Sequence, residues 1–95
     1  MPKAYWIAHV DVVEAEPYSV YAKLASACFA KYGANILARG GKCQRLEGKV
    51  RARNVVIEFE SMDQALACYN SPEYQEAKAH REGNAQAELL IVEGA

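Results

Sequence analysis

Residues 53–75 read RNVVIEFESMDQALACYNSPEYQ and carry the clearest local signals in the chain. Residues 54–59 are mainly β-branched and apolar, with Glu58 set among them, which is typical of a strand buried on at least one face. Ser61 and Gln64 have the spacing of a helix capping box, in which each side chain bonds a free backbone N–H of the other residue. The segment therefore predicts a central strand followed directly by a helix.

The same segment predicts that the second helical region is broken in two. Ser71 is a typical N-cap, and Pro72 suits the first helical position because its missing N–H would be unpaired there anyway. Residues spaced three or four apart form the stripe that we expect to face the core. These residues are Met62, Ala65, Leu66 and Tyr69 on the first helix, and Tyr74, Ala77 and Arg81 on the second.

The remaining elements are predicted on either side of this segment. Residues 4–12 alternate as a strand, with Trp6, Ala8, Val10 and Val12 on one face and Tyr5, Ile7, His9 and Asp11 on the other. A helix begins near residues 14–17 and ends at Gly33, and its expected core stripe is Tyr21, Leu24, Ala25, Cys28 and Tyr32. Residues 35–47 predict a long strand interrupted at Gly40 and Gly41, and residues 88–93 the last strand.

This order, β-α-β-β-α-β, predicts a single ferredoxin-like α+β domain over residues 1–95, with a four-stranded antiparallel sheet and its helices on one side. The uncovered face would carry Tyr5, Ile7, Val56 and either Leu90 or the pair Leu89 and Ile91. Such a face is too apolar to meet water in a monomer, so we expect a second sheet to cover it. The predicted partner is a second copy of the chain.

Composition limits the possible classes of protein. Of the 95 residues, 52% are hydrophobic, which excludes a disordered chain. The sequence has no apolar run of about 18 residues, so we expect no membrane partner. The N-terminus has no apolar stretch of the secretory kind, and we therefore expect a cytoplasmic protein.

No motif for a metal or a cofactor is present in the sequence. Cys28, Cys43 and Cys68 are widely spaced and odd in number, so we expect reduced thiols rather than disulfides or a zinc site. The pair Gly40 and Gly41 lacks the following helix and the lysine spacing of a phosphate-binding loop. We therefore predict no metal and no cofactor.

Several motifs spread over nearly the whole chain resemble one known family. They are YWIAxVDV, KYG, ARGG, RNVVIEF, ALACYxSPEYQ and IVEG, and together they resemble the family of domain of unknown function 1330. The resemblance implies a dimeric α/β barrel, in which two ferredoxin-like subunits pack sheet against sheet. The wider group includes cofactor-independent monooxygenases, lactone isomerases and haem-binding enzymes, so kinship of fold does not select a reaction.

The mixed faces of the strands supply the candidate catalytic residues. His9 and Glu58 are expected to face the barrel interior with Arg39, Tyr5 and Asp11. In an enzyme, His9 would be the acid or base, Glu58 would orient it, and Arg39 would hold an anion. The alternative is a buried ionic network that fixes the dimer.

Three helical residues are further candidates for substrate binding. Tyr69, Tyr74 and Arg81 could close one end of the pocket, although such residues are also common helix-packing groups. The predicted function is binding of a small acidic or carbonyl metabolite, with cofactor-independent proton transfer or oxygenation as the possible chemistry. The alternative is a non-catalytic dimeric binding or interaction module.

Positive charge is concentrated between Arg39 and Arg53, with only Glu47 opposing it. A basic segment on a ferredoxin-like sheet could bind nucleic acid. However, the net charge of the chain is −1 and no RNP-type sequence is present. We therefore predict a solvated hairpin and no nucleic-acid partner.

Overall fold

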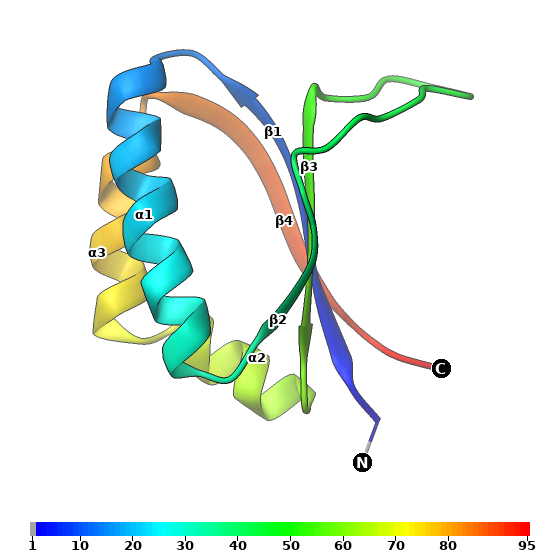
Figure 1. Ribbon diagram of the computed structural model, residues 1–95, viewed down its shortest axis with the longest axis vertical. Helices are drawn as coiled ribbons and strands as arrows, with labels where there is room; N and C mark the ends of the chain where they lie inside the picture. The colour runs from blue at the N-terminus through cyan, green and yellow to red at the C-terminus, as the bar shows by residue number, and fades with distance from the viewer. Residues whose placement is uncertain (1) are drawn as a thin grey trace.

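Apolar residues alternate along the strands and form one stripe along each helix, so each element has one face for the core. All three helices cover one face of a four-stranded antiparallel sheet, as expected (Figure 1). The computed structural model describes residues 2–95, and neighbouring strands follow the order β2-β3-β1-β4. The fold is ferredoxin-like, as predicted. Its elements are β1 (Ala4–Val12), α1 (Ala15–Lys31), β2 (Asn35–Arg39), β3 (Arg53–Phe59), α2 (Met62–Tyr69), α3 (Pro72–Arg81) and β4 (Ala85–Glu93).

The core between sheet and helices is built around Trp6, which is only 1% exposed. Its ring centroid lies 5.1 Å from that of Phe29, 5.8 Å from Phe59 and 4.9 Å from Tyr74. Aromatic rings at such separations add favourable edge and stacking contacts to the burial of their area. Ala4, Trp6, Ala8 and Val10 therefore form the helix-covered face, as the alternation predicts. Val12 was expected on the same face, but it lies at the end of the strand and is 41% exposed.

The helix starts at Ser61 and Ser71 are confirmed. The Ser61 hydroxyl accepts from the Gln64 backbone N–H at 3.1 Å, and the Ser71 hydroxyl accepts from the Tyr74 N–H at 3.1 Å. The reciprocal half of the predicted capping box is not formed, because the Gln64 side chain donates to the Tyr32 carbonyl at 2.7 Å. Gln64 thus ties the start of α2 to the end of α1.

The predicted core stripe of α1 needs one correction. Leu24 is 36% exposed, whereas Phe29 is buried against Trp6. The buried positions follow the spacing of three or four residues from Tyr18 to Phe29, and Leu24 lies beside that stripe. On α2, Leu66 is likewise exposed rather than buried.

Strand β2 is shorter than predicted and ends at Arg39. Residues 40–52 leave the sheet as an irregular segment, which we call the arm, and project away on the side opposite the helices (Figure 1). The turn out of the strand favours Gly40 because its φ is +67°, a conformation that strains other residues. A Cβ at this position would also lie 2.3 Å from the Arg53 guanidinium, which would have to move.

The second face of the sheet, the open face, is uncovered in the subunit. Its central apolar residues are Ile7, Val56 and Leu90, since Ile7 pairs with both of the others across the ladder. Leu90 is 50% exposed. Of the two predicted alternatives for β4, the residue on the open face is therefore Leu90. In residues 2–95, no helix is both long and apolar enough to cross a membrane.

Candidate functional site

A cavity of about 40 Å³ lies between the sheet and the helices, and most of its lining residues are apolar. Trp6 and Phe29 contribute to its floor together with small residues of β1 and α1. The polar groups on its wall include three guanidinium groups, from Arg39, Arg53 and Arg81. Pockets that are mostly apolar with a few convergent polar groups are typical of small-molecule sites.

The arginines in this cavity have few partners. The Nε atoms of Arg53 and Arg81 are buried and make no hydrogen bond within residues 2–95. Arg53 lies over the Tyr18 ring at 5.7 Å, and Arg81 lies over the Tyr21 ring at 5.2 Å, measured from Cζ to the ring centroid. Aromatic faces thus orient both cations, while no carboxylate of the described residues forms an ion pair with them.

Three cations on one cavity repel one another, and the buried Nε atoms of Arg53 and Arg81 lack hydrogen-bond acceptors within residues 2–95. A buried donor that is left unpaired costs about 1–3 kcal/mol. A carboxylate offers two oxygens that match the guanidinium fork and would lower this cost. The cavity is therefore suited to an acid whose anionic group lies among the arginines.

Tyr21 and Tyr74 provide neutral hydroxyl groups close to this site. Their hydroxyl oxygens are 2.8 Å apart. Burial is the main cause that raises the pKa of both phenols, so both remain protonated near neutral pH. Tyr21 lines the cavity, but Tyr74 is 0% exposed and belongs to the core, so its predicted place in the pocket is wrong.

A β-bulge moves Arg39 away from its predicted place beside His9. The register of β2 against β3 shifts between Ile36 and Ala38, and Arg39 therefore pairs with Val55. Val55 is on the helix-covered side and lines the cavity. Without the extra residue, Arg39 would be opposite Asn54, which pairs with His9 on the open face. The bulge thus converts an expected open-face arginine into a cavity residue.

The two other helical candidates do not meet. Arg81 lies at the cavity, whereas Tyr69 lies near the edge strand β4 in a shallow hollow with Met62, Leu66 and residues 89–91. The Lys78 ammonium lies over the Tyr69 ring, with Nζ 5.7 Å from the ring centroid. The structure therefore brings Arg39 and Arg81 together but leaves Tyr69 outside this group.

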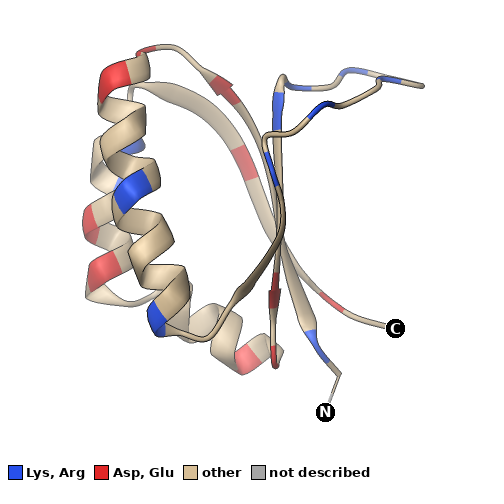
Figure 2. Cartoon of the chain, viewed as in Figure 1, with Lys and Arg blue, Asp and Glu red and all other residues tan. Residues whose placement is uncertain are grey.

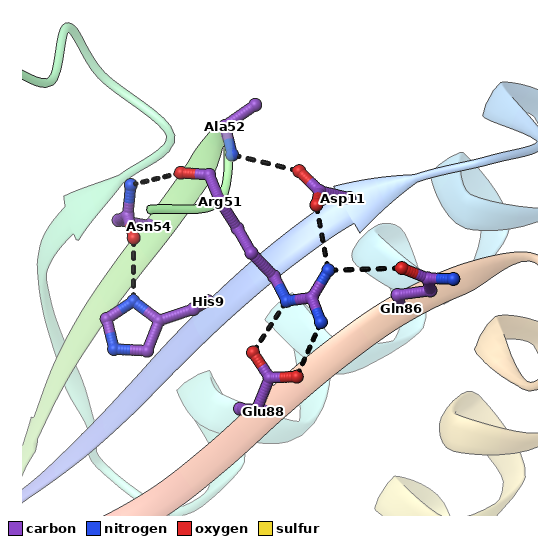
Figure 3. Close-up of polar contacts among 7 residues, drawn as sticks. All are labelled: His9, Asp11, Arg51, Ala52, Asn54, Gln86 and Glu88. Atoms are coloured by element: carbon purple, nitrogen blue, oxygen red, sulfur yellow. Dashed lines mark hydrogen bonds and ion pairs between the residues drawn. The ribbon is translucent and has the colours of Figure 1, made fainter. Parts of the chain in front are cut away.

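On the open face, His9 is held by Asn54 (Figure 3). His9 Nδ1 lies 2.7 Å from Asn54 Oδ1. The Asn54 amide nitrogen donates to the Arg51 carbonyl at 3.1 Å, which directs the Asn54 oxygen toward the histidine. Because an amide oxygen only accepts, Nδ1 carries the hydrogen and Nε2 of the neutral ring is left as the acceptor.

Arg51 is the centre of an ionic cluster near His9 (Figure 3). Its guanidinium donates to Glu88 at 2.6 and 2.7 Å and to Asp11 at 2.8 Å. The Ala52 N–H and then Arg51 lower the pKa of Asp11, while Arg51 is the main cause that lowers the pKa of Glu88. These bonds join the base of the arm to strands β1 and β4.

Glu58 does not orient His9, in contrast to the sequence-based expectation. Its carboxylate accepts from the Tyr5 hydroxyl at 3.3 Å and forms an ion pair with Lys3 at 3.4 Å. Along the β1–β3 ladder, the pair of Ile7 and Val56 lies between the Tyr5–Glu58 pair and the His9–Asn54 pair. Asn54 therefore takes the orienting position that was predicted for Glu58.

Sequence reasoning did not include Arg53 and Asn54 in the site. The signal for Arg53 was available, because the alternation of Val55, Ile57 and Phe59 extends back to it and places it on the helix-covered face. Asn54 alternates with Val56 and Glu58 and therefore shares their face, but only the register shows that it is opposite His9. Residue type and spacing alone do not give that pairing.

The cysteines form no cross-link. All three are free, and the buried Sγ atoms of Cys28 and Cys68 lie 3.7 Å apart. Burial raises the pKa of the Cys68 thiol, which keeps it protonated and unreactive. In residues 2–95, no group of three or more His, Cys, Asp or Glu side chains has an arrangement that could hold a metal ion.

Comparison with known sequences identifies one family. The sequence model of the domain of unknown function DUF1330 matches residues 3–95. No curated protein matches the chain.

Several solved structures share the fold. A protein of unknown function from Rhodopseudomonas palustris has a TM-score of 0.81 at 18% identity, over 99% of this chain and 83% of that chain. The cofactor-independent oxygenase SnoaB from Streptomyces nogalater has a TM-score of 0.72 at 10% identity, and the match covers 100% of this chain and 95% of that chain. A dimeric ferredoxin-like protein of unknown function from Bacteroides fragilis has a TM-score of 0.59 at 15% identity, over 97% and 96%.

Proposed function

The chain belongs to the family described as domain of unknown function DUF1330, and we propose that this member is a homodimer that binds a small acidic metabolite between sheet and helices. The observation that carries the proposal is the convergence of Arg39, Arg53 and Arg81 on one apolar cavity. Two of these side chains have buried Nε donors without acceptors in the described residues. An anionic ligand supplies the acceptors that the protein lacks.

The size of the cavity limits the ligand. A volume of about 40 Å³ corresponds to room for about three water-sized groups. The enclosed part of the ligand is therefore a carboxylate with a very short apolar stem, and any larger part lies outside the mouth. Tyr21 contributes a protonated hydroxyl near this position, which suits donation to a carboxylate or carbonyl oxygen.

The proposal of a homodimer rests on the open face. Ile7, Val56 and Leu90 form an apolar strip along its centre, and a second sheet would remove that strip from water. The dimeric relative from Bacteroides fragilis supports this arrangement, since it combines a ferredoxin-like fold with a dimer. In such a dimer, His9 lies inside the barrel.

A second candidate function is cofactor-independent catalysis inside this barrel. The bond from His9 to Asn54 favours it, because this bond leaves Nε2 free to take a proton from a carbonyl or phenolic substrate. A carbanion formed in this way can be reprotonated elsewhere or can react with oxygen. The similarity in fold to the oxygenase SnoaB supports the second outcome. Without turnover, the protein is a binding module that uses the arginine cavity alone.

The test is a thermal-shift titration with acetate, pyruvate and benzoate at constant ionic strength. A ligand at a hundred times its dissociation constant stabilises the folded state by about 2.7 kcal/mol, which is about 10–20 °C in Tm for a domain of this size. We expect the shift in the wild type and its loss in Arg53→Met and Arg81→Met. Lys23→Met is the control, since Lys23 is an exposed cation of α1 that does not line the cavity.

The stability of the ligand-free variants provides an independent readout. Removing the buried, unpaired Nε donor should raise the stability of Arg53→Met by about 1 kcal/mol, while binding is lost. Shifts that persist in both cavity variants would contradict the proposal. For the second candidate, oxygen uptake or proton exchange with phenols and lactones is measured in wild type and His9→Ala, and turnover that survives in His9→Ala excludes His9 as the base.

A further inference from the structure

The arm is hydrogen-bonded to the sheet at its base, and its residues 40–50 are exposed to solvent. Arg51 bonds to Asp11 and Glu88, and the Ala52 N–H donates to Asp11 at 3.0 Å. Beyond this anchor the segment projects from the sheet on the side of the open face (Figure 1). Leu46 on the arm is 87% exposed. Val50 on the arm is also 45% exposed, so the arm presents two apolar side chains for contact with another chain.

The arm and the open face enclose a polar hollow. This hollow has a volume of about 580 Å³ and is lined by Asp11, Arg45, Lys49, Val50, Arg51 and Glu88. Its acidic residues are already paired with Arg51, so the charges left free are those of Arg45 and Lys49. The hollow is therefore suited to an acidic segment that approaches along the open face.

The two ends of the sheet have opposite charge (Figure 2). Lys and Arg gather along the arm and the adjoining strand ends, whereas Asp and Glu predominate where β3 and β4 end. At that acidic end, Glu58 is paired with Lys3. Glu60 and Glu93 are exposed there and form no ion pair within residues 2–95.

Symmetry connects these two ends. Two sheets that pack face to face in a closed dimer are related by a twofold axis lying between them. If that axis runs across the strands, the basic end of each subunit lies over the acidic end of the other. If the axis runs along the strands, basic end lies on basic end and the charges repel. Charge complementarity therefore selects the first orientation.

We propose that the arm of each subunit grips the acidic end of the partner's sheet in the homodimer. Lys42, Arg45 and Lys49 provide the positive charge, and Glu60 and Glu93 of the second copy receive it. Leu46 is covered by the apolar part of the same face, near Val92, which is 45% exposed. This inference rests on the dimer proposed above and is independent of the ligand in the arginine cavity.

The test uses two charge-reversed variants. One carries Lys42→Glu, Arg45→Glu and Lys49→Glu, and the other carries Glu60→Lys and Glu93→Lys. Each variant alone places like charges at both contacts of the dimer, so we expect its dimer dissociation constant to rise at least about tenfold. Mixed together, the two variants place opposite charges at both contacts. Native mass spectrometry should then find mainly the heterodimer.

The controls keep the outcomes distinct. Circular dichroism establishes that both variants fold, and one chain that carries all five changes should regain homodimerisation. A wild-type chain that stays monomeric would overturn the dimer itself. Dimers of both variants that persist unchanged, or two monomeric variants that fail to combine, would overturn the role of the arm. Salt-sensitive binding of single-stranded RNA to the arm in place of dimer formation would overturn it too.

Discussion

Arginines on the two sides of the sheet differ in whether they are paired with carboxylates. On the covered side, the guanidinium groups of Arg53 and Arg81 have buried Nε atoms without partners in the described residues. On the more exposed side, Arg51 is bonded to two carboxylates. Desolvation makes an unpaired charge costly on the covered side and cheap on the open one, so the observed distribution is not the most stable.

This difference indicates two separate tasks. In the proposed function, the unpaired donors of the covered cavity are retained for a ligand, as binding sites commonly sacrifice stability for function. On the open face, the paired charges of Arg51 hold the base of the arm, and Asn54 holds His9. The covered face is thus suited to recognition of a small acid, and the open face to assembly and to any proton transfer by His9.

The largest effect on the free energy of unfolding is expected from replacing two adjacent residues of β1 that lie on opposite faces of the sheet. Trp6→Ala removes the centre of the aromatic core and should lower the free energy of unfolding by about 3–5 kcal/mol. Ile7→Ala acts on the open face, and we expect a smaller loss that depends on protein concentration, because its cost falls on the proposed dimer. Urea unfolding at several concentrations measures both. Equal, concentration-independent losses would contradict the distinction between the faces.

A smaller effect is expected from the tyrosine hydroxyl groups. Tyr21→Phe leaves the buried Tyr74 hydroxyl without its partner and should cost about 1–2 kcal/mol. Tyr5→Phe removes a hydroxyl that is 3.3 Å from Glu58 on the open face, where water replaces the bond, and should cost less. Tyr21→Phe combined with Tyr74→Phe should cost less than the sum of the single changes. Additive losses would show that the two hydroxyls act independently.

The smallest effect is a dependence on pH at the Arg51 cluster. The pKa values of Asp11 and Glu88 are lowered from 3.8 and 4.5, so their stabilising contribution is present above these values and is lost as the pH falls through the lower folded values. The difference in urea midpoint between wild type and Arg51→Gln should therefore be constant from neutral pH to about 5.5 and shrink below about 4.5. Lys23→Gln, which removes an exposed cation that forms no ion pair within residues 2–95, serves as the control. A difference that grows in acid would contradict this assignment.

The amino-acid sequence by itself determines most of the secondary structure, because the deciding interactions are local. The strand of residues 4–12 follows from alternation, and the caps at Ser61 and Ser71 are set by residues three positions away. Glu58, Tyr5 and His9 also lie on the open face, as the alternation predicts. A ferredoxin-like sheet with one uncovered face follows from the order of these elements.

Only the tertiary structure decides which side chains meet in a site. The bulge before Arg39 reverses the side of the sheet that this residue faces, and its position depends on how β2 pairs with β3 rather than on the adjacent glycines. Arg53 and Arg81 are distant in sequence, and packing of α3 against the sheet brings them to one cavity. Asn54 replaces Glu58 beside His9 because register, which is a property of two strands, selects the partner.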